Sequence, residues 1–234
     1  FDARAVFGLY PAQRTGADTV SVFDEAGQTV THTFEHLRQQ SDKVTGKPNL
    51  SLADYIKPTT TQQDYLGGFT VSIFGAEELA NEYKAKGDDY SAILVQSLAD
   101  RFAEAFAEHL HERIRKEFWG YKADETLNNE ELIKEKYVGI RPPPGYPACP
   151  EHSEKAALFD WLGSEAKIGT KLTEHFAMMP PSSVSGFYYS HPESEYFNVG
   201  KISQDQLEDY AKRKGWSLDE AKRWLAPNLD DSVS

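Results

Sequence analysis

The fold of this chain is decided by residues 88–118, DDYSAILVQSLADRFAEAFAEHLHERIRKEF, which contain neither glycine nor proline. Apolar residues recur along this stretch at helical spacing: Leu94, Leu98, Phe102, Phe106, Leu110, Ile114 and Phe118. A repeat of four residues places successive side chains on the same side of a helix. We therefore predict one long central helix and expect Leu98, Phe102 and Phe106 to face the core.

The residues before this helix show the alternation that is typical of strands. Thr19–Phe23 and Val30–Phe34 alternate apolar and polar residues, and DEAGQ between them has turn composition, which predicts a β-hairpin. We expect its buried face to carry Val20, Val22, Val30 and Phe34. Ala5–Leu9, which we expect to stop at Pro11, and Phe69–Phe74, entered through Gly67 and Gly68, are expected to join the same sheet.

The residues after the helix are more varied. We predict helices over 129–137 and 152–163, strands over 183–190 and 195–202, and two short helices between 204 and 224, the second capped by Ser217. Residues 141–150, RPPPGYPACP, hold five prolines and can form neither a helix nor a central strand. The fold class we predict is α+β: a twisted, largely antiparallel sheet flanked by helices.

Composition excludes several classes of protein. The 234 residues carry a formal charge of −12, which disfavours binding to nucleic acid or to an anionic membrane. No apolar run approaches the roughly 18–20 residues that span a bilayer. The single cysteine, Cys149, cannot form an internal disulfide or a cysteine-rich zinc site, which is consistent with a cytoplasmic protein. His109 and His111 lie two residues apart, the wrong spacing for two metal ligands on one helix face, and we expect no metal site.

The proline-rich segment 141–150 admits two readings. A proline-rich run is most often a stiff linker. Here it begins with Arg141, contains Gly145 and Tyr146, and leads into the charged residues 151–155, EHSEK. Proline holds the main chain in preset directions, which suits recognition of a small ligand at low ordering cost, and Gly145 lets a ligand approach the backbone.

Residues 139–155, GIRPPPGYPACPEHSEK, closely resemble the signature of the C-terminal activation domain of cobalamin-dependent methionine synthases. Further segments resemble the same family in the same order: LADYI at 52–56, residues 88–121, LTEHFAM at 172–178, SVSGFYYSHPESEYF at 183–197 and WLAPNL at 224–229. The resemblance covers nearly the whole chain. It implies a single C-shaped domain over residues 1–234, the C-terminal module of a longer methionine synthase, with S-adenosylmethionine in a shallow groove.

The resemblance also implies roles for individual residues. Asp54 matches the position that contacts the ligand's amino group, and Arg141 matches the arginine that meets its carboxylate, for which a guanidinium is a natural partner. The main chain of the following segment is expected to cradle the ligand. Tyr196 and Phe197 match an aromatic pair near the adenosyl group, although Phe197 replaces the commoner tyrosine. The implied binding residues are Asp54, Glu104, Glu135, Arg141, Pro142, Gly145, Tyr146, Ala148, Tyr196 and Phe197.

The function that the resemblance implies is reactivation of methionine synthase. The domain would present the methyl group of S-adenosylmethionine to inactive cob(II)alamin, which a cobalamin-binding module holds, while a flavodoxin-type protein or equivalent supplies one electron. A candidate docking patch for that donor is the basic group Lys212, Arg213, Lys214, Lys222 and Arg223. No side chain needs to act as a catalytic acid, base or nucleophile, because the sulfonium is already an activated donor.

Two other functions stay open. The domain could hold S-adenosylmethionine only as a sensor or docking switch, without methyl transfer. It could also be an acidic interaction domain whose proline-rich segment is a linker, in which case it binds no adenosyl ligand.

Overall fold

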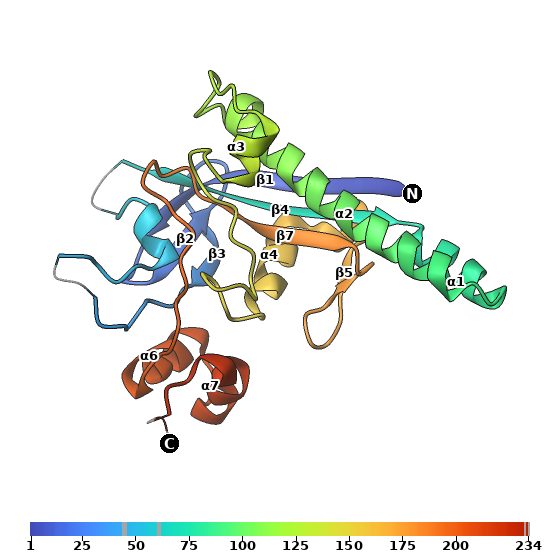
Figure 1. The fold of residues 1–234 in the computed structure, drawn as a ribbon. Helices are drawn as coiled ribbons and strands as arrows, with labels where there is room; N and C mark the ends of the chain where they lie inside the picture. Colours follow the sequence, from blue (N-terminus) through green and yellow to red (C-terminus); the bar gives the residue numbers. More distant parts are fainter. Residues whose placement is uncertain (44–45, 60–61, 232, 234) are drawn as a thin grey trace. The chain divides into compact units, whose positions relative to one another are not determined.

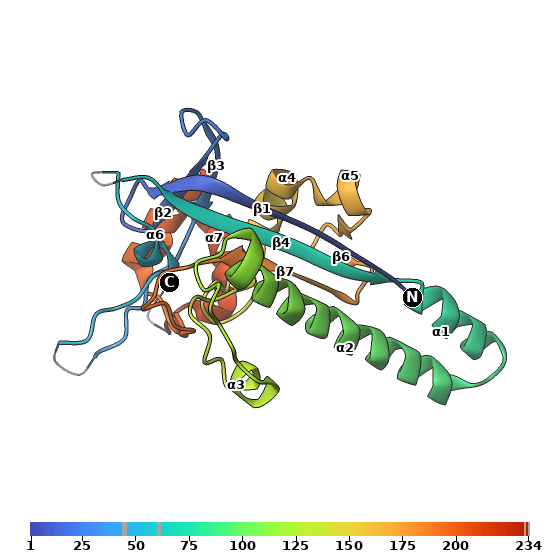
Figure 2. The same ribbon diagram turned by 90° about the horizontal axis from the view of Figure 1, so that it is seen from above.

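A computed structural model describes residues 1–43, 46–59, 62–231 and 233, and Figure 1 shows their fold. Five strands form an antiparallel sheet in the order β3-β2-β1-β4-β7. They are β1 (Asp2–Arg14), β2 (Thr19–Phe23), β3 (Val30–Glu35), β4 (Asp64–Phe74) and β7 (Ser183–Tyr188). Two short strands, β5 (Lys171–Leu172) and β6 (Met178–Met179), pair separately. Figure 2 shows the long strands β1 and β4 side by side.

The helices account for most of the remaining regular structure. They are α1 (Ala76–Ala85), α2 (Asp89–Arg113), α3 (Asn129–Ile133), α4 (Glu154–Leu162), α5 (Ser164–Ile168), α6 (Gln204–Lys214) and α7 (Leu218–Leu225). A π-helical turn, η2 (Ile114–Phe118), continues α2, and two 3-10 turns are η1 (Leu52–Tyr55) and η3 (Ala226–Asn228). The predicted α+β class is confirmed. The C-shape remains a prediction.

The chain divides into two compact units, each described here by itself. Unit 1 comprises residues 1–8, 68–138 and 158–186, and unit 2 comprises residues 9–67, 139–157 and 187–234. Among the described residues, no helix combines the length and the apolar character that crossing a membrane requires.

The long helix of unit 1 has the predicted extent but a different buried face. Leu98 and Phe102, which we expected in the core, are 45% and 51% exposed. The buried face is lined with small residues: Ala92, Val95, Ala99, Ala103 and Ala107. Alanine lets a helix approach its neighbours closely, and α2 packs this face against α1 and Ile73. The helix is apolar on two adjacent faces: Leu94, Leu98 and Phe102 lie on the outer one, whereas Leu110, near the C-terminal end, is buried.

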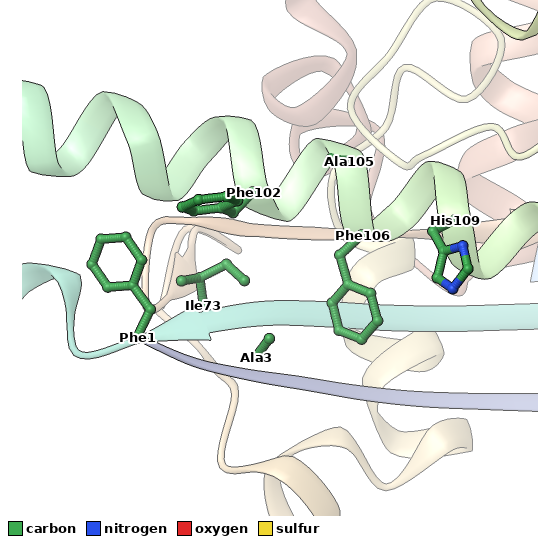
Figure 3. A pocket seen from close by; sticks show the side chains of 7 residues that line it. All are labelled: Phe1, Ala3, Ile73, Phe102, Ala105, Phe106 and His109. Atoms are coloured by element: carbon green, nitrogen blue, oxygen red, sulfur yellow. The ribbon is translucent and has the colours of Figure 1, made fainter. Parts of the chain in front are cut away.

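Phe102 and Phe106, on that outer face, line an apolar groove in unit 1. Figure 3 shows Phe102 near Phe1 and Ile73, and Phe106 extending from the helix toward the strands near Ala3, with Ala105 and His109 along the same helix. The rings of Phe1 and Phe102 meet edge to face with centroids 5.8 Å apart. The groove has a volume of about 510 Å³.

In unit 2 the hairpin forms as predicted, with one change of face. A β-bulge between Val22 and Phe23 shifts the register, so that Val22 pairs with His32 and Phe23 with Val30. The shift leaves Val30 50% exposed, whereas Val20, Val22 and Phe34 are buried.

Other predicted boundaries change as well. Strand β1 runs through Pro11, and its pairing with β2 involves Ala12–Arg14, whose N–H groups are intact. The predicted strand over 195–202 is wrong: it belongs to no sheet, because its Val199 N–H bonds to the Pro147 carbonyl, in the proline-rich segment. Its C-terminal residues pack into a second core with α6 and α7, formed by Leu37, Val199, Ile202, Leu207, Tyr210, Ala211, Ala221 and Leu225.

Candidate functional site

The proline-rich segment 141–150 is neither helix nor strand, as predicted, and backbone hydrogen bonds hold it on both sides. The Pro142 carbonyl accepts from Phe187 N–H at 3.1 Å, and the Pro147 carbonyl accepts from Val199 N–H at 2.9 Å. Within the segment, Gly145 N–H donates to the Cys149 carbonyl at 2.7 Å. Because proline supplies no N–H and fixes φ, these few bonds are enough to hold the main chain in one conformation.

The structure brings two predicted ligand residues together. The backbone N–H of Arg141 donates to the Tyr196 hydroxyl at 3.0 Å, across 55 positions of sequence. Tyr196 is 37% exposed, so its ring lies at the surface beside the start of the segment. Its neighbour Phe197 instead packs against the core formed by α6 and α7. Of the predicted aromatic pair, Tyr196 is the residue that lies beside Arg141.

Gly145 lies at the tightest point of the segment. Its φ is +92°, a conformation that favours glycine, and a Cβ there would come within 2.3 Å of the His152 ring. The ring of His152 therefore lies directly against the Gly145 backbone. Tyr146, the next residue, is 58% exposed, whereas Ala148 and Pro142 are buried. Of the predicted cradle, Tyr146 presents its side chain outward.

Cys149 is buried, and burial raises the pKa of its thiol well above the ordinary value. A thiol that stays protonated is a poor nucleophile, which agrees with a packing role.

Asp54 has a carboxylate that is already fully bonded. Oδ1 accepts from Arg14 Nη1 and Arg38 Nη2, both at 2.8 Å, and Oδ2 accepts from Arg38 Nη1 at 2.6 Å and Ser51 N–H at 2.9 Å. Burial alone would raise the pKa of this carboxyl, but the hydrogen bonds from Arg38 and Ser51 and the charges of both arginines outweigh it, and the pKa is lowered. A ligand ammonium at Asp54 would have to compete with four donors. The contact remains a prediction.

Asp54→Ala is expected to destabilise the protein by about 2 kcal/mol, because two partly buried guanidinium groups lose their shared acceptor. Since the folded pKa of Asp54 is lowered, this contribution is present above the unfolded pKa and is lost as the pH falls through the folded value. Urea unfolding at pH 7 and pH 3 measures both effects. The matched control is Asp2→Ala, which removes an exposed arginine pair and should cost less than about 0.5 kcal/mol.

Glu104 and Glu135 lie in unit 1, whereas the other predicted ligand residues lie in unit 2. Glu104 is exposed on α2. Glu135 is exposed after α3 with φ +52°, a rare conformation outside glycine. Their roles at the ligand remain predictions.

A buried ion pair that the sequence reasoning missed holds the chain between α2 and Glu135. Arg115, fully buried in η2, makes a bidentate pair with Glu125 at 2.6 and 2.8 Å. Its guanidinium lies over the Tyr137 ring, 4.5 Å from the centroid. The π-helical turn is the local departure that carries Arg115 inward. From sequence alone, a charged residue in a helix is expected to be solvent-exposed. The only sign of burial was that Arg115 directly follows Ile114, a residue of the apolar repeat.

Across residues 1–43, 46–59, 62–231 and 233, no group of three histidine, cysteine or acidic side chains is arranged to hold a metal ion. What the structure offers in unit 2 is a rigid main-chain segment flanked by a guanidinium and an exposed tyrosine. This arrangement suits a small ligand with a carboxylate and an aromatic ring system.

Comparison with known proteins identifies the family of the chain. Residues 1–215 match the family model described as vitamin B12 dependent methionine synthase, activation domain. A crystal structure of the MetH reactivation domain bound to AdoHcy is similar at 53% sequence identity and a TM-score of 0.94, covering 97% of this chain and 70% of that chain. By both its sequence and its fold, this chain belongs to the family of activation domains of vitamin B12-dependent methionine synthases.

Proposed function

We propose that this chain binds S-adenosylmethionine at the proline-rich segment and presents its methyl group for reductive methylation of cob(II)alamin. The proposal treats residues 1–234 as one activation module of a longer methionine synthase. It is supported by family membership and by the AdoHcy complex of a relative that shares 53% of its sequence. The observation that carries it is the bond from Arg141 N–H to Tyr196, which joins two residues proposed to hold opposite ends of the ligand.

The residues of the site suit each part of the ligand. The Arg141 guanidinium would pair with the methionine carboxylate, and Tyr196 would lie along the adenosyl group. The main chain of Pro142–Ala148, with Gly145 at its closest approach, would hold the sulfonium centre. Glu104 and Glu135 are proposed as further acids on the ligand side. S-adenosylmethionine supplies an activated methyl group, so the protein's own part is to place that group.

Two partners complete the proposed reaction. A cobalamin-binding module would hold cob(II)alamin, and a flavodoxin-type protein or equivalent would supply one electron. Cobalamin held by that module would be the methyl acceptor once it is reduced, and S-adenosylhomocysteine would be the other product. For the electron donor, the candidate basic patch is smaller than the sequence indicates. Arg213 pairs with Glu35 and Asp209, and Lys214 pairs with Glu154, whereas Lys212 and Arg223 are exposed.

Arg141→Ala is expected to weaken binding of S-adenosylhomocysteine by roughly 10–100-fold, because the ligand carboxylate loses a charge-assisted hydrogen bond. Calorimetric titration measures the affinity, and circular dichroism verifies folding. The charge-matched control is Arg223→Ala, an exposed position on α7 that should leave affinity unchanged. Equal affinities for wild type and Arg141→Ala would remove Arg141 from the site, and absence of binding by wild type would contradict the proposed function.

The alternative function, sensing without methyl transfer, makes the same binding prediction. Mixing the chain with S-adenosylmethionine, a cobalamin-binding module, cob(II)alamin and a one-electron reductant distinguishes the two. Appearance of the methylcobalamin spectrum supports transfer, and saturable ligand binding without that spectrum supports sensing.

A further inference from the structure

A buried group of charges lies directly behind the proline-rich segment, all of it in unit 2. Glu151 and Glu154 follow the segment and are 2% and 1% exposed. Lys214, at the end of α6, places its ammonium 2.5 Å from Glu154 Oε1 and 3.9 Å from Glu151 Oε2. We refer to Glu151, Glu154 and Lys214 as the Lys214 cluster. One ammonium group thus lies close to two buried carboxyl groups.

The two carboxyl groups are not equally satisfied. Glu151 accepts from the Ser153 N–H at 2.6 Å, from the Ser153 hydroxyl at 2.5 Å and from the Tyr210 hydroxyl at 3.3 Å. Within the part of the chain that the structure describes, no donor reaches Glu154 Oε2, although this atom is buried. Glu154 therefore relies on Lys214 for its hydrogen bonding. An unpaired buried carboxylate is costly, so the position of Glu154 follows that of the ammonium.

The surroundings of Glu154 reinforce this dependence. Burial raises the pKa of its carboxyl to about 7, Lys214 opposes the rise, and the charges of Glu151 and Glu35 add to it. Other titratable groups nearby are Cys149, Tyr189 and Tyr210, whose pKa values are all raised by burial, and the Arg213 cation beside Tyr210. His36 also lies near Lys214 and Arg213, and burial together with these two cations lowers its pKa to about 3. Lys155 is the other cation next to Cys149. Lys214 is the cation in hydrogen-bond contact with Glu154.

The cluster is mechanically close to the ligand segment. Glu151 is separated from Cys149 only by Pro150, whose ring fixes its φ. Cys149 closes the turn around Gly145: its carbonyl accepts from Gly145 N–H at 2.7 Å, and its N–H donates to the Tyr146 carbonyl at 2.9 Å. His152, which lies against Gly145, stands between the two glutamates in sequence. A displacement of either glutamate would therefore also displace the backbone of Gly145 and Tyr146, because few residues and several short contacts connect them.

We propose that Lys214 is a positioning residue for ligand binding: by holding Glu154 and Glu151, its ammonium sets the conformation of the segment 141–150 that receives the adenosyl ligand. The inference rests on the proposed function, since it concerns the same site. It assigns Lys214 no contact with the ligand. Because Lys214 is paired within the cluster, it does not belong to the basic patch that the sequence indicates for an electron donor.

The test is a titration of S-adenosylhomocysteine into the whole chain and its variants. Lys214→Met, which keeps length and removes charge, is expected to lower the affinity about 10-fold, and Lys214→Arg to stay within about 3-fold of wild type. Glu154→Gln alone should lose roughly 5-fold, because the ammonium loses its nearest negative charge. The double variant K214M/E154Q should recover most of the loss, because its neutral pair leaves no uncompensated charge at position 154.

A pH series supplies the readout that a purely structural role would not move. Lys214 lowers the pKa of Glu154, so its removal moves that pKa above about 7. The ratio of wild-type to Lys214→Met affinity should therefore change little below pH 7 and grow as the pH rises further, because the unpaired carboxyl of Glu154 then becomes charged. The ratio should stay constant for the double variant. If Lys214→Met does not fold, Glu154→Gln and the double variant still give the comparison.

The outcomes are distinct. Wild-type affinity in folded Lys214→Met, or an affinity loss that neither the double variant nor pH alters, overturns the positioning role and leaves the proposed function standing. Absence of binding by the wild type overturns both.

Discussion

Gly145→Ala is expected to reduce affinity for S-adenosylhomocysteine by at least about 100-fold, the largest effect at the site. The positive φ of +92° costs an alanine about 1–2 kcal/mol. The new Cβ would also lie 2.3 Å from the His152 ring, and relieving such a clash costs about 1–3 kcal/mol. Together these reach about 3 kcal/mol, which corresponds to roughly 100-fold in affinity.

The loss should appear in binding rather than in stability. The turn at Gly145 lies partly at the surface, where Tyr146 is 58% exposed. The unliganded variant can therefore shift this turn locally, while the bonds to Pro142 and Pro147 keep the rest of the segment in place, and it must restore the turn on binding. Gly200→Ala is the matched control, because Gly200 also has a positive φ, +74°, but a Cβ there would meet nothing within 4 Å. If titration calorimetry finds the two variants equally tight, the turn at Gly145 plays no part in the site.

Glu125→Ala is expected to cost about 3–5 kcal/mol of stability, the largest effect outside the site. Arg115 is fully buried and Glu125 supplies both of its charged hydrogen bonds, so the substitution leaves an uncompensated buried cation. Stacking on Tyr137 offsets only part of the loss. Urea unfolding followed by circular dichroism measures the change in the free energy of unfolding.

Glu117→Ala provides the comparison from the neighbouring turn. The pair of Arg113 with Glu117 has the same chemistry and a 2.8 Å contact, but both side chains are about half exposed. Its removal should cost far less stability than the removal of Glu125, because solvent screens the pair and replaces its hydrogen bonds. If both substitutions lower the free energy of unfolding equally, the burial of Arg115 does not increase the contribution of its ion pair to stability.

Periodicity predicted the extent of the long helix but not its buried face. Leu98 and Phe102 form the more obvious apolar stripe, yet alanines such as Ala99 and Ala103 make the closest packing. A count of apolar residues weights large side chains, whereas close approach between a helix and its neighbours selects small ones. The hairpin was predicted more fully, and only the bulge at Val22 and Phe23 escaped, since a register shift depends on pairing and not on composition.

For the candidate site too, the sequence predicted some features and not others. Resemblance to the family pointed to Arg141 and Tyr196, and the structure joins them by a hydrogen bond. For Asp54 the sequence indicates a carboxylate on a loop, but not that Arg14 and Arg38 occupy it. Lys214 looked like part of a solvated basic run, because sequence does not show that the end of α6 meets two buried glutamates. These roles depend on contacts with segments that are distant in the sequence, and the local sequence pattern does not indicate such contacts.

The order in which these contacts are synthesised has a consequence for the nascent chain. Tyr196 is made 55 residues after Arg141, and Lys214 is made 60 residues after Glu154. At about 5–20 residues per second, roughly 3–12 s separate Glu154 from its cation on the ribosome. During that interval the two glutamates stay in water, because their burial awaits the ammonium. If Lys214 has the positioning role proposed above, the proline-rich segment acquires its binding conformation only after α6 has been made, and chains halted before α6 lack that conformation.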